Sequence, residues 1–238
     1  MALPLATQWT LVASGLIAHA DHVLTGEECE RLMGLVDEVA DGDDYAQWMS
    51  IISDPEALET QLAGLPIPPQ QSHRKIAETA WLMAVVDGER VDAEIAALQR
   101  IAARLSIEPM QLEFWREAWT TAQHGFAEIT AAAAGWMLGG GGPVLPEDRG
   151  VIRDITHALP TTHEHREQLV DRGCVAQDGE DIERRLRALT KPQRRDLLQR
   201  LIDVISQATR SDEARERLRQ LAAGSGLSTE DRARLQGL

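Results

Sequence analysis

The sequence predicts an all-α protein made of two helical bundles. Ala and Leu are abundant, aromatic residues make up 4% of the 238 residues, and runs of Val, Ile and Thr hardly occur. This composition favours helix over strand. Apolar residues also recur at the spacing of a buried helical stripe, and a run of glycines breaks that pattern. We therefore expect a helical domain over 1–138, a glycine- and proline-rich linker over 139–146, and a second helical domain over 147–238.

Three segments of the first half have clear helical periodicity. Apolar side chains follow the i, i+3, i+4 pattern within 77–85, 95–105 and 115–129, which predicts three amphipathic helices. An earlier helix is predicted to begin at Asp54 and Pro55, because Asp is a favoured N-cap and Pro is favoured at the first helical position.

The linker and the second-half helices are predicted from glycines and caps. The run from Gly139 to Gly142 costs too much backbone entropy to lie inside a helix, so we expect a hinge there. Beyond it, apolar stripes within 198–205 and 218–222 predict two helices, and Ser228 is a candidate N-cap for a short last helix.

The two halves resemble each other. A shift of 120 residues places 100–107 on 220–227, and the segment 54–70 resembles 181–193. The matching order of helices and turns favours a duplicated domain. Chance similarity between two helical stretches rich in Leu, Ala and Arg is the alternative interpretation.

The charge is unevenly distributed. Residues 1–138 contain 21 Asp and Glu against 7 Lys and Arg, whereas residues 139–238 contain 17 of each, so the formal net charge of −14 belongs to the first half. A chain this acidic repels a phosphate backbone, which argues against general nucleic-acid binding. Cations or a basic protein surface are the expected partners.

Cysteine content and hydropathy indicate the cellular compartment of the protein. Cys29 and Cys174 lie far apart and form no CxxC pattern, which fits a reducing cytoplasm. Residues 1–20 have no positive charge and several polar side chains, unlike a signal peptide. The longest weakly polar run, 129–144, is interrupted by glycines, so we expect a cytoplasmic protein without membrane insertion.

An internal echo lies within the first half. Asp21 and Glu28 are seven residues apart, as are Asp87 and Glu94, and in both cases one helix is expected to end near the Asp and the next to begin near the Glu. The echo indicates two helical hairpins related by a pseudo-two-fold axis.

The segment ETAWLMAVVDGERVDAEIAALQRIAARLSIEP, residues 78–109, resembles the tellurite-resistance TerB-like helical domain. Its Asp87-Gly88 turn, the Val91-Asp92 pair and Glu94 stand where that family has its pattern, and the resemblance extends over 5–125. The resemblance implies a compact all-α domain of a bacterial stress or resistance system, with an acidic cation site.

The resemblance is weaker over the second half. There the shift places Gln207 and Ala214 where Asp87 and Glu94 stand, so the second copy is expected to lack the cation site.

The acidic turns are the candidate cation site. If the hairpins pack as mirror partners, the carboxylates of Asp21, Glu28, Asp87 and Glu94 converge, with Asp92 nearby. Such oxygen ligands suit Ca²⁺, Mg²⁺ or Mn²⁺, although the ligand spacing of an EF-hand is missing. The alternative is that these acids only cap helices and stabilise their dipoles.

Histidine offers a second reading. His22 adjoins Asp21, so a small helical metalloenzyme with His22, Asp21, Asp87 and Glu94 as ligands is the rival to a binding protein. The other histidine cluster, 157–165, is expected to lie in a loop because Pro160 interrupts it.

No nucleophile paired with a base, no P-loop and no GxGxxG pattern occurs in the sequence. We therefore expect a non-enzymatic binding or stress-response protein. Its acidic half would bind a divalent cation or a basic or membrane-associated protein, and its second half would serve as a docking or homodimerisation unit.

Overall fold

The computed structural model describes residues 3–235, and within them the protein is entirely helical. There are 13 α-helices and two short 3-10 helices in this range, and no strand. The all-α prediction is confirmed. None of the helices in the described range is both long enough and apolar enough to cross a membrane.

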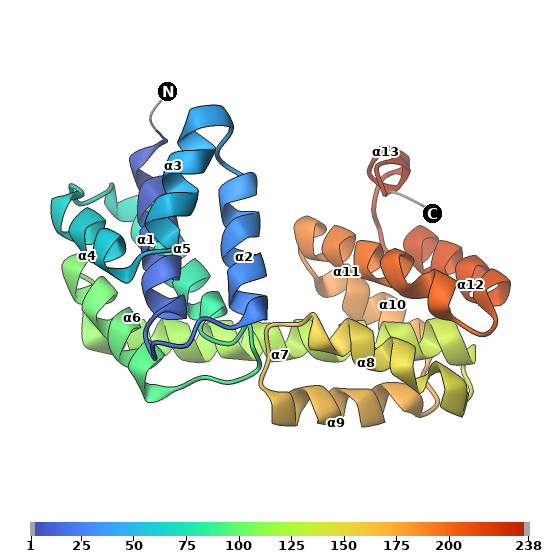
Figure 1. Cartoon of the computed structure of the whole chain (residues 1–238). Coiled ribbons are helices and arrows are strands. Elements are labelled where there is room, and N and C mark those ends of the chain that lie inside the picture. The colour runs from blue at the N-terminus through green and yellow to red at the C-terminus, as the bar shows by residue number, and fades with distance from the viewer. Residues whose placement is uncertain (1–2, 236–238) are drawn as a thin grey trace. The chain divides into compact units, whose positions relative to one another are not determined.

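The chain divides into two compact units, which we call unit 1 (residues up to 121) and unit 2 (residues from 122 onward). The long helix α7 runs through the boundary and contributes to both (Figure 1). The helices of unit 1 are α1 (Leu5–Ala18), α2 (Gly26–Asp37), α3 (Gly42–Ile52), α4 (Pro55–Gly64), α5 (Gln70–Met83), α6 (Asp92–Arg104) and the first part of α7 (Pro109–Gly139).

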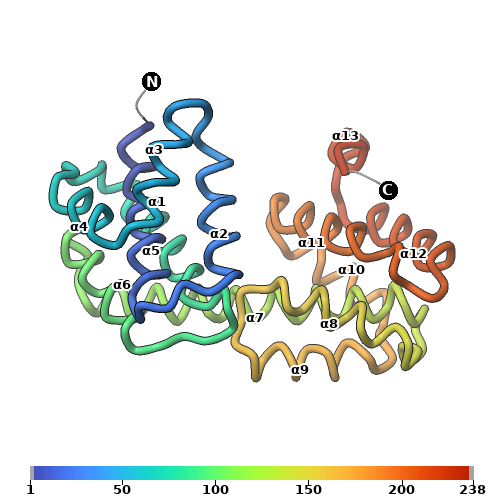
Figure 2. Tube along the Cα trace, viewed as in Figure 1, coloured from blue at the N-terminus to red at the C-terminus, as the bar shows by residue number. Residues whose placement is uncertain are grey.

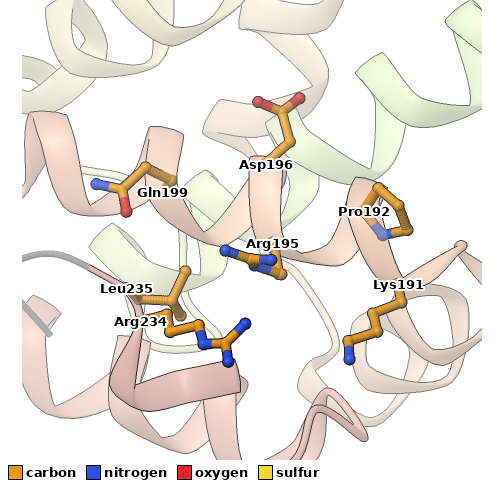
Figure 3. A pocket seen from close by; sticks show the side chains of 7 residues that line it. All are labelled: Lys191, Pro192, Arg195, Asp196, Gln199, Arg234 and Leu235. Atoms are coloured by element: carbon orange, nitrogen blue, oxygen red, sulfur yellow. The ribbon is translucent and has the colours of Figure 1, made fainter. Parts of the chain in front are cut away.

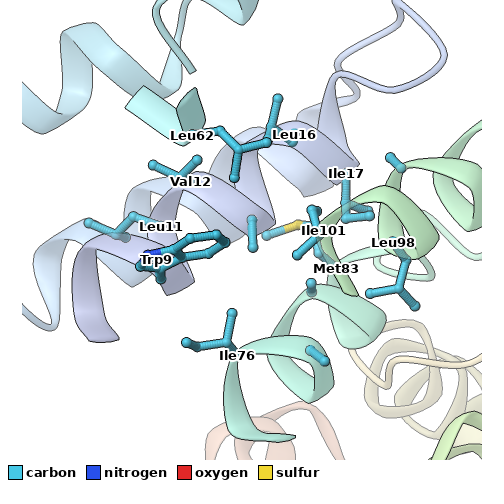
Figure 4. Packing of buried hydrophobic residues seen from close by; sticks show 14 of the residues in the cluster. Trp9, Leu11, Val12, Leu16, Ile17, Leu62, Ile76, Met83, Leu98 and Ile101 are labelled. Atoms are coloured by element: carbon cyan, nitrogen blue, oxygen red, sulfur yellow. The ribbon is translucent and has the colours of Figure 1, made fainter. Parts of the chain in front are cut away.

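Helix α1 forms the centre of unit 1. It is mostly apolar and carries no charged residue, and it packs against α2, α4, α5 and α6. Its residues Trp9 and Ile17 are fully buried, and they lie among Met83 of α5 and Ile101 of α6 (Figure 4). Because the apolar stripes of α5 and α6 both face α1, the ends of these helices are fixed relative to one another.

The start of α4 follows the predicted cap. Asp54 Oδ1 accepts a hydrogen bond from the backbone N–H of Glu56 at 2.9 Å, and Pro55 is the first residue of α4. The predicted start of this helix is confirmed. The proline-rich segment 66–69 that follows connects α4 to α5, and the Pro66 carbonyl accepts a hydrogen bond from Trp9 Nε1 at 2.7 Å.

Unit 2 has a core of its own, built around the second part of α7. Its further elements are η1 (Pro146–Asp148), α8 (Arg149–His157), α9 (His163–Cys174), α10 (Gly179–Ala188), α11 (Lys191–Val204), η2 (Ile205–Gln207), α12 (Ser211–Gly224) and α13 (Thr229–Ala233). Met137 of α7 is fully buried in a cluster with Ile152 of α8, Leu201 of α11 and Leu218 of α12.

The glycine run ends α7 and is held within unit 2. Gly140 and Gly141 have φ of 60° and 91°, a backbone conformation that glycine adopts without strain. Arg217 of α12 donates hydrogen bonds to the last carbonyls of the helix, at 2.8 Å to Met137 and 3.1 Å to Leu138. Gly140 to Gly142 lie outside the helix, and the hinge expected at this segment stays a prediction. The predicted domain bounds on either side of 139–146 stay a prediction about folding units, because compact packing and independent folding are different properties.

The placement of the histidine cluster was wrongly predicted. His157 is the last residue of α8, and both His163 and His165 belong to α9. Pro160 interrupts only the short connection between the two helices, and α9 begins directly after Thr162. A proline marks a break at its own position and does not exclude helix three residues later.

Candidate functional site

Two turns of unit 1, one after α1 and one after α5, have the same backbone structure. In the first, Asp21 Oδ1 accepts a hydrogen bond from the N–H of Val23 at 2.9 Å. In the second, Asp87 Oδ1 accepts one from the N–H of Glu89 at 3.0 Å. The residue after each Asp is left-handed, with φ of 68° in the first turn and 89° in the second. Both turns are therefore Asx turns with the same fold.

The helices that follow begin in the same way. Glu28 is the third residue of α2, and its Oε2 accepts the N–H of Thr25 at 2.9 Å. Glu94 is the third residue of α6, and its Oε2 accepts the N–H of Val91 at 2.8 Å. The Thr25 hydroxyl completes a reciprocal capping box, which Val91 cannot do because it has no side-chain oxygen. The sequence echo is thus also a repeat of local structure.

The two turns lie at the same end of unit 1 (Figures 1 and 2), and the helices α1 and α5 that precede them pack against each other. Burial raises the pKa of Glu28, and the carboxylates of Asp87 and Asp21 raise it further, against the capping hydrogen bonds that lower it. Burial also raises the pKa of Glu94 to about 7, and the other three carboxylates add to this rise. The structure therefore brings the four acids of the two turns within electrostatic reach of one another.

We call Asp21, Glu28, Asp87 and Glu94 the four-carboxylate cluster. Glu28 and Glu94 are 4% and 5% exposed, whereas the two aspartates are more accessible. Each carboxylate uses one oxygen for the backbone hydrogen bond given above, and the second oxygen has no hydrogen bond within residues 3–235. None of the four forms an ion pair in that range. Four uncompensated carboxylates with four free oxygens favour a positively charged ligand.

The other two predicted ligands lie apart from this arrangement. Asp92 is exposed in the first turn of α6, and His22 is exposed at the left-handed position of the first turn. Neither is among the principal charges that act on Glu28 or Glu94. Of the six predicted residues, four therefore act on one another electrostatically, and these two do not share in that interaction.

Sequence reasoning missed a pair of arginines beside the cluster. The guanidinium of Arg90 lies 3.6 Å from the ring centre of Trp81, and that of Arg116 lies 4.6 Å from the same ring. Burial lowers the pKa of Arg90 to about 10, while Glu94 raises it and Arg116 lowers it further. The position of Arg90, in the turn that precedes α6 and four residues before Glu94, was the available signal. The stacking of Arg90 on Trp81, a residue of α5, was not visible in the sequence.

The arrangement is not a preformed metal centre. Among the residues that the structure describes, no group of three or more His, Cys, Asp or Glu side chains is placed to hold a metal ion. The free oxygens of Asp21 and Asp87 lie on accessible side chains, so rotation about their side-chain bonds is the movement that would complete a coordination shell. The chemistry that these carboxylate oxygens can provide is the binding of a cation.

Comparison of the chain with protein-family models, with curated proteins and with solved structures finds no match in any of the three. The resemblance to the TerB-like family stays a prediction, and the site must be interpreted from its own geometry.

Proposed function

We propose that the protein is a non-enzymatic binding module whose unit 1 binds a divalent cation at the four-carboxylate cluster. What supports the proposal is that four carboxylates, each with an oxygen free of hydrogen bonds within residues 3–235, belong to two turns of the same structure and act electrostatically on one another. The TerB-like resemblance of residues 5–125 points in the same direction, toward a stress or resistance role.

Among the cations considered, Ca²⁺ fits the cluster best. Ca²⁺ accepts roughly six to eight oxygen ligands at about 2.3–2.6 Å in flexible geometry, whereas Mg²⁺ requires a near-ideal octahedron. The glutamates are held at helix starts by capping hydrogen bonds, and the aspartates are held by Asx turns. Each carboxylate therefore has one oxygen held by a hydrogen bond and one that is free to coordinate. Such ligands suit Ca²⁺, which tolerates irregular geometry.

The cluster has a physical reason to take up a cation. Bringing carboxylates together and burying two of them costs free energy, because like charges repel and water is lost. A bound cation offsets both costs, because its charge attracts the carboxylates and its coordination bonds replace lost water. Arg90 does not remove them, because it forms no ion pair with Glu94 and its guanidinium stacks on Trp81.

The test is thermal unfolding of the full chain with CaCl₂, MgCl₂ or MnCl₂ against the same protein in EDTA. A ligand that binds the folded state stabilises it by RT ln(1 + [L]/Kd), about 2.7 kcal/mol at roughly 100 times Kd. The double variant Asp87→Asn, Glu94→Gln should lose this shift and should be more stable than the wild type in EDTA.

Asp54→Asn is the matched control. Asp54 forms the same hydrogen bond to the N–H two residues on, but it stands at the start of α4 and is not part of the cluster. This variant should keep the full shift. If millimolar Ca²⁺, Mg²⁺ and Mn²⁺ leave wild-type unfolding unchanged, the four acids are helix caps only, and the acidic surface of unit 1 would instead be assigned to a basic protein partner.

A further inference from the structure

Unit 2 contains a pocket that the cation proposal does not involve. It has a volume of about 410 Å³ and lies between the start of α11 and the short helix α13 (Figure 3). Its lining residues are Lys191, Pro192, Arg195, Asp196, Gln199, Arg234 and Leu235. Three of these seven side chains are cations and one is an anion, in a protein whose net charge is −14.

The three cations of the pocket differ in how they are held. The Lys191 ammonium pairs with Asp231 at 2.9 Å, and Arg234 pairs with Glu230 one turn earlier on α13. Arg195 is half-buried, and its guanidinium forms no ion pair and no hydrogen bond with any residue from 3 to 235. An uncommitted guanidinium therefore lies beside two cations that each have one acidic partner on α13.

The one acid of the lining does not serve as a counter-ion to Arg195. Asp196 accepts two hydrogen bonds from Arg200 Nε, at 3.1 and 3.2 Å. In Figure 3 its carboxylate points away from the side on which Arg195, Arg234 and Lys191 lie. The pocket thus presents an excess of positive charge to whatever occupies it.

We propose that this pocket binds a small phosphate-bearing molecule. A guanidinium is a planar fork that matches phosphate oxygens with two parallel hydrogen bonds, and an ammonium supplies a point charge to the same group. The volume is that of a small-molecule site, which typically measures roughly 300–1,000 Å³. A nucleic-acid backbone is a poor alternative, because the positive charge is confined to this pocket and the whole chain is strongly acidic.

The roles of the three cations follow from their partners. Arg195 makes the direct contact, because it has no internal bond to give up. Arg234 adds charge and a second fork, and it must partly release Glu230 to do so. Lys191 is held by Asp231, whose pKa is lowered to about 2 by the hydrogen bond from Ser228 and by Lys191, so it contributes charge from a fixed position.

The test is a calorimetric titration of the full chain at low salt, once with inorganic phosphate and once with pyrophosphate. We expect saturable binding that weakens about tenfold in Arg195→Ala and by a smaller factor in Arg234→Ala. Arg195→Gln keeps much of the packing and should fail like Arg195→Ala, which separates loss of binding from loss of folding. Arg184→Ala is the matched control: Arg184 is an exposed arginine of unit 2 that pairs with Asp181 outside the pocket, and its loss should leave affinity unchanged.

A second arm distinguishes the source of the phosphate. Vesicles that carry phosphorylated inositol lipids are compared with soluble pyrophosphate. Binding to pyrophosphate supports a soluble ligand, and Arg195-dependent binding to vesicles alone supports a lipid headgroup of the same chemistry. No binding to either, or equal affinity in Arg195→Ala and Arg184→Ala, would overturn the proposal.

Discussion

Units 1 and 2 differ in their charge balance and in how their acidic side chains are paired. Residues 1–121 carry 20 Asp and Glu against 7 Lys and Arg, whereas residues 122–238 carry 18 against 17. In unit 2 acids are paired along and between helices, as in Arg217 with Glu213 and Arg172 with Glu128. In unit 1 the four-carboxylate cluster gathers acids at one end without a paired cation.

The difference shows that net charge alone does not locate a site. Exposed ion pairs of the kind found in unit 2 contribute little each, with a median of roughly 0–1 kcal/mol, so their number says little about stability or function. Both units also place acids at helix starts, where capping and the helix dipole favour them. What distinguishes unit 1 is that burial, together with the carboxylates of Asp87 and Asp21, raises the pKa of the acids at two such starts, Glu28 and Glu94, and perturbed acids of this kind are common at binding sites.

Among the changes that can distinguish unit 1 from unit 2, Gly135→Ala in α7 should have the largest effect on stability. A Cβ at Gly135 would lie 2.0 Å from the Gly173 carbonyl oxygen of α9, a backbone atom that cannot move aside. We expect destabilisation of about 3 kcal/mol or more. Gly125→Ala in the same helix is the control, because its Cβ meets no atom within 4 Å, and it should be neutral or stabilising by about 0.5–1 kcal/mol.

Hydrogen exchange on Gly135→Ala shows whether the comparison describes two folding units. Loss of amide protection confined to unit 2 would mean that the units unfold separately. Equal loss in both would contradict this and would mean that α7 joins them into one cooperative structure.

A smaller effect concerns pH and unit 1. In the metal-free protein the pKa of Glu94 is about 7, against 4.5 for the free side chain. The folded state therefore holds more protons than the unfolded state between these values, and the free energy of unfolding should decrease as pH rises from 4.5 to 7. Glu94→Gln keeps the capping acceptor and should remove this slope, with a gain of about 1–2 kcal/mol at pH 8.

Denaturant unfolding in EDTA at several pH values measures the slope. Glu78→Gln, an acid of α5 that pairs with Lys75 outside the cluster, should keep the wild-type pH dependence. A Glu94→Gln protein with the wild-type slope would contradict the assignment of the slope to the cluster.

The smallest expected effect is a pH dependence of the stability of unit 2. Its sign is opposite to that expected for Glu94 in unit 1. The rings of His165 and His124 stack with centroids 4.1 Å apart. Burial lowers the pKa of His165; His124 and Arg172 lower it further, while Glu128 raises it. The folded state therefore holds fewer protons than the unfolded state, so this group destabilises unit 2 as pH falls through 6.5, by a few tenths of a kcal/mol because it is partly exposed.

Histidine titration by NMR measures this directly. The pKa of His165 should lie below 6.5 in the wild type and should rise in His124→Gln, which removes the neighbouring charge. A His165 pKa above 6.5 would mean that Glu128 dominates the pair, and the contrast in pH response between the units would disappear.

The local features of this protein were determined by the sequence itself. The start of α4, the end of α7 in the glycine run and the seven-residue spacing of the two acidic turns were all predictable. Each depends on hydrogen bonds or backbone preferences between residues close in the chain, which the sequence states directly. The limit of such reasoning is shown by His163 and His165. They were predicted to lie in a loop because Pro160 is nearby, and they belong to α9.

The tertiary structure alone decided which local features meet. The sequence predicted convergence of the carboxylates only on the condition that the hairpins pack as mirror partners. The structure shows that α1 packs against α5 and that the four acids act on one another electrostatically, and their convergence on one ligand stays a prediction. The burial of Glu94, the stacking of Arg90 on Trp81 and the pocket around Arg195 likewise join helices that are distant in the chain. Such contacts depend on how side-chain volumes fill a shared core, and that is a property of the whole packed unit rather than of any segment within it.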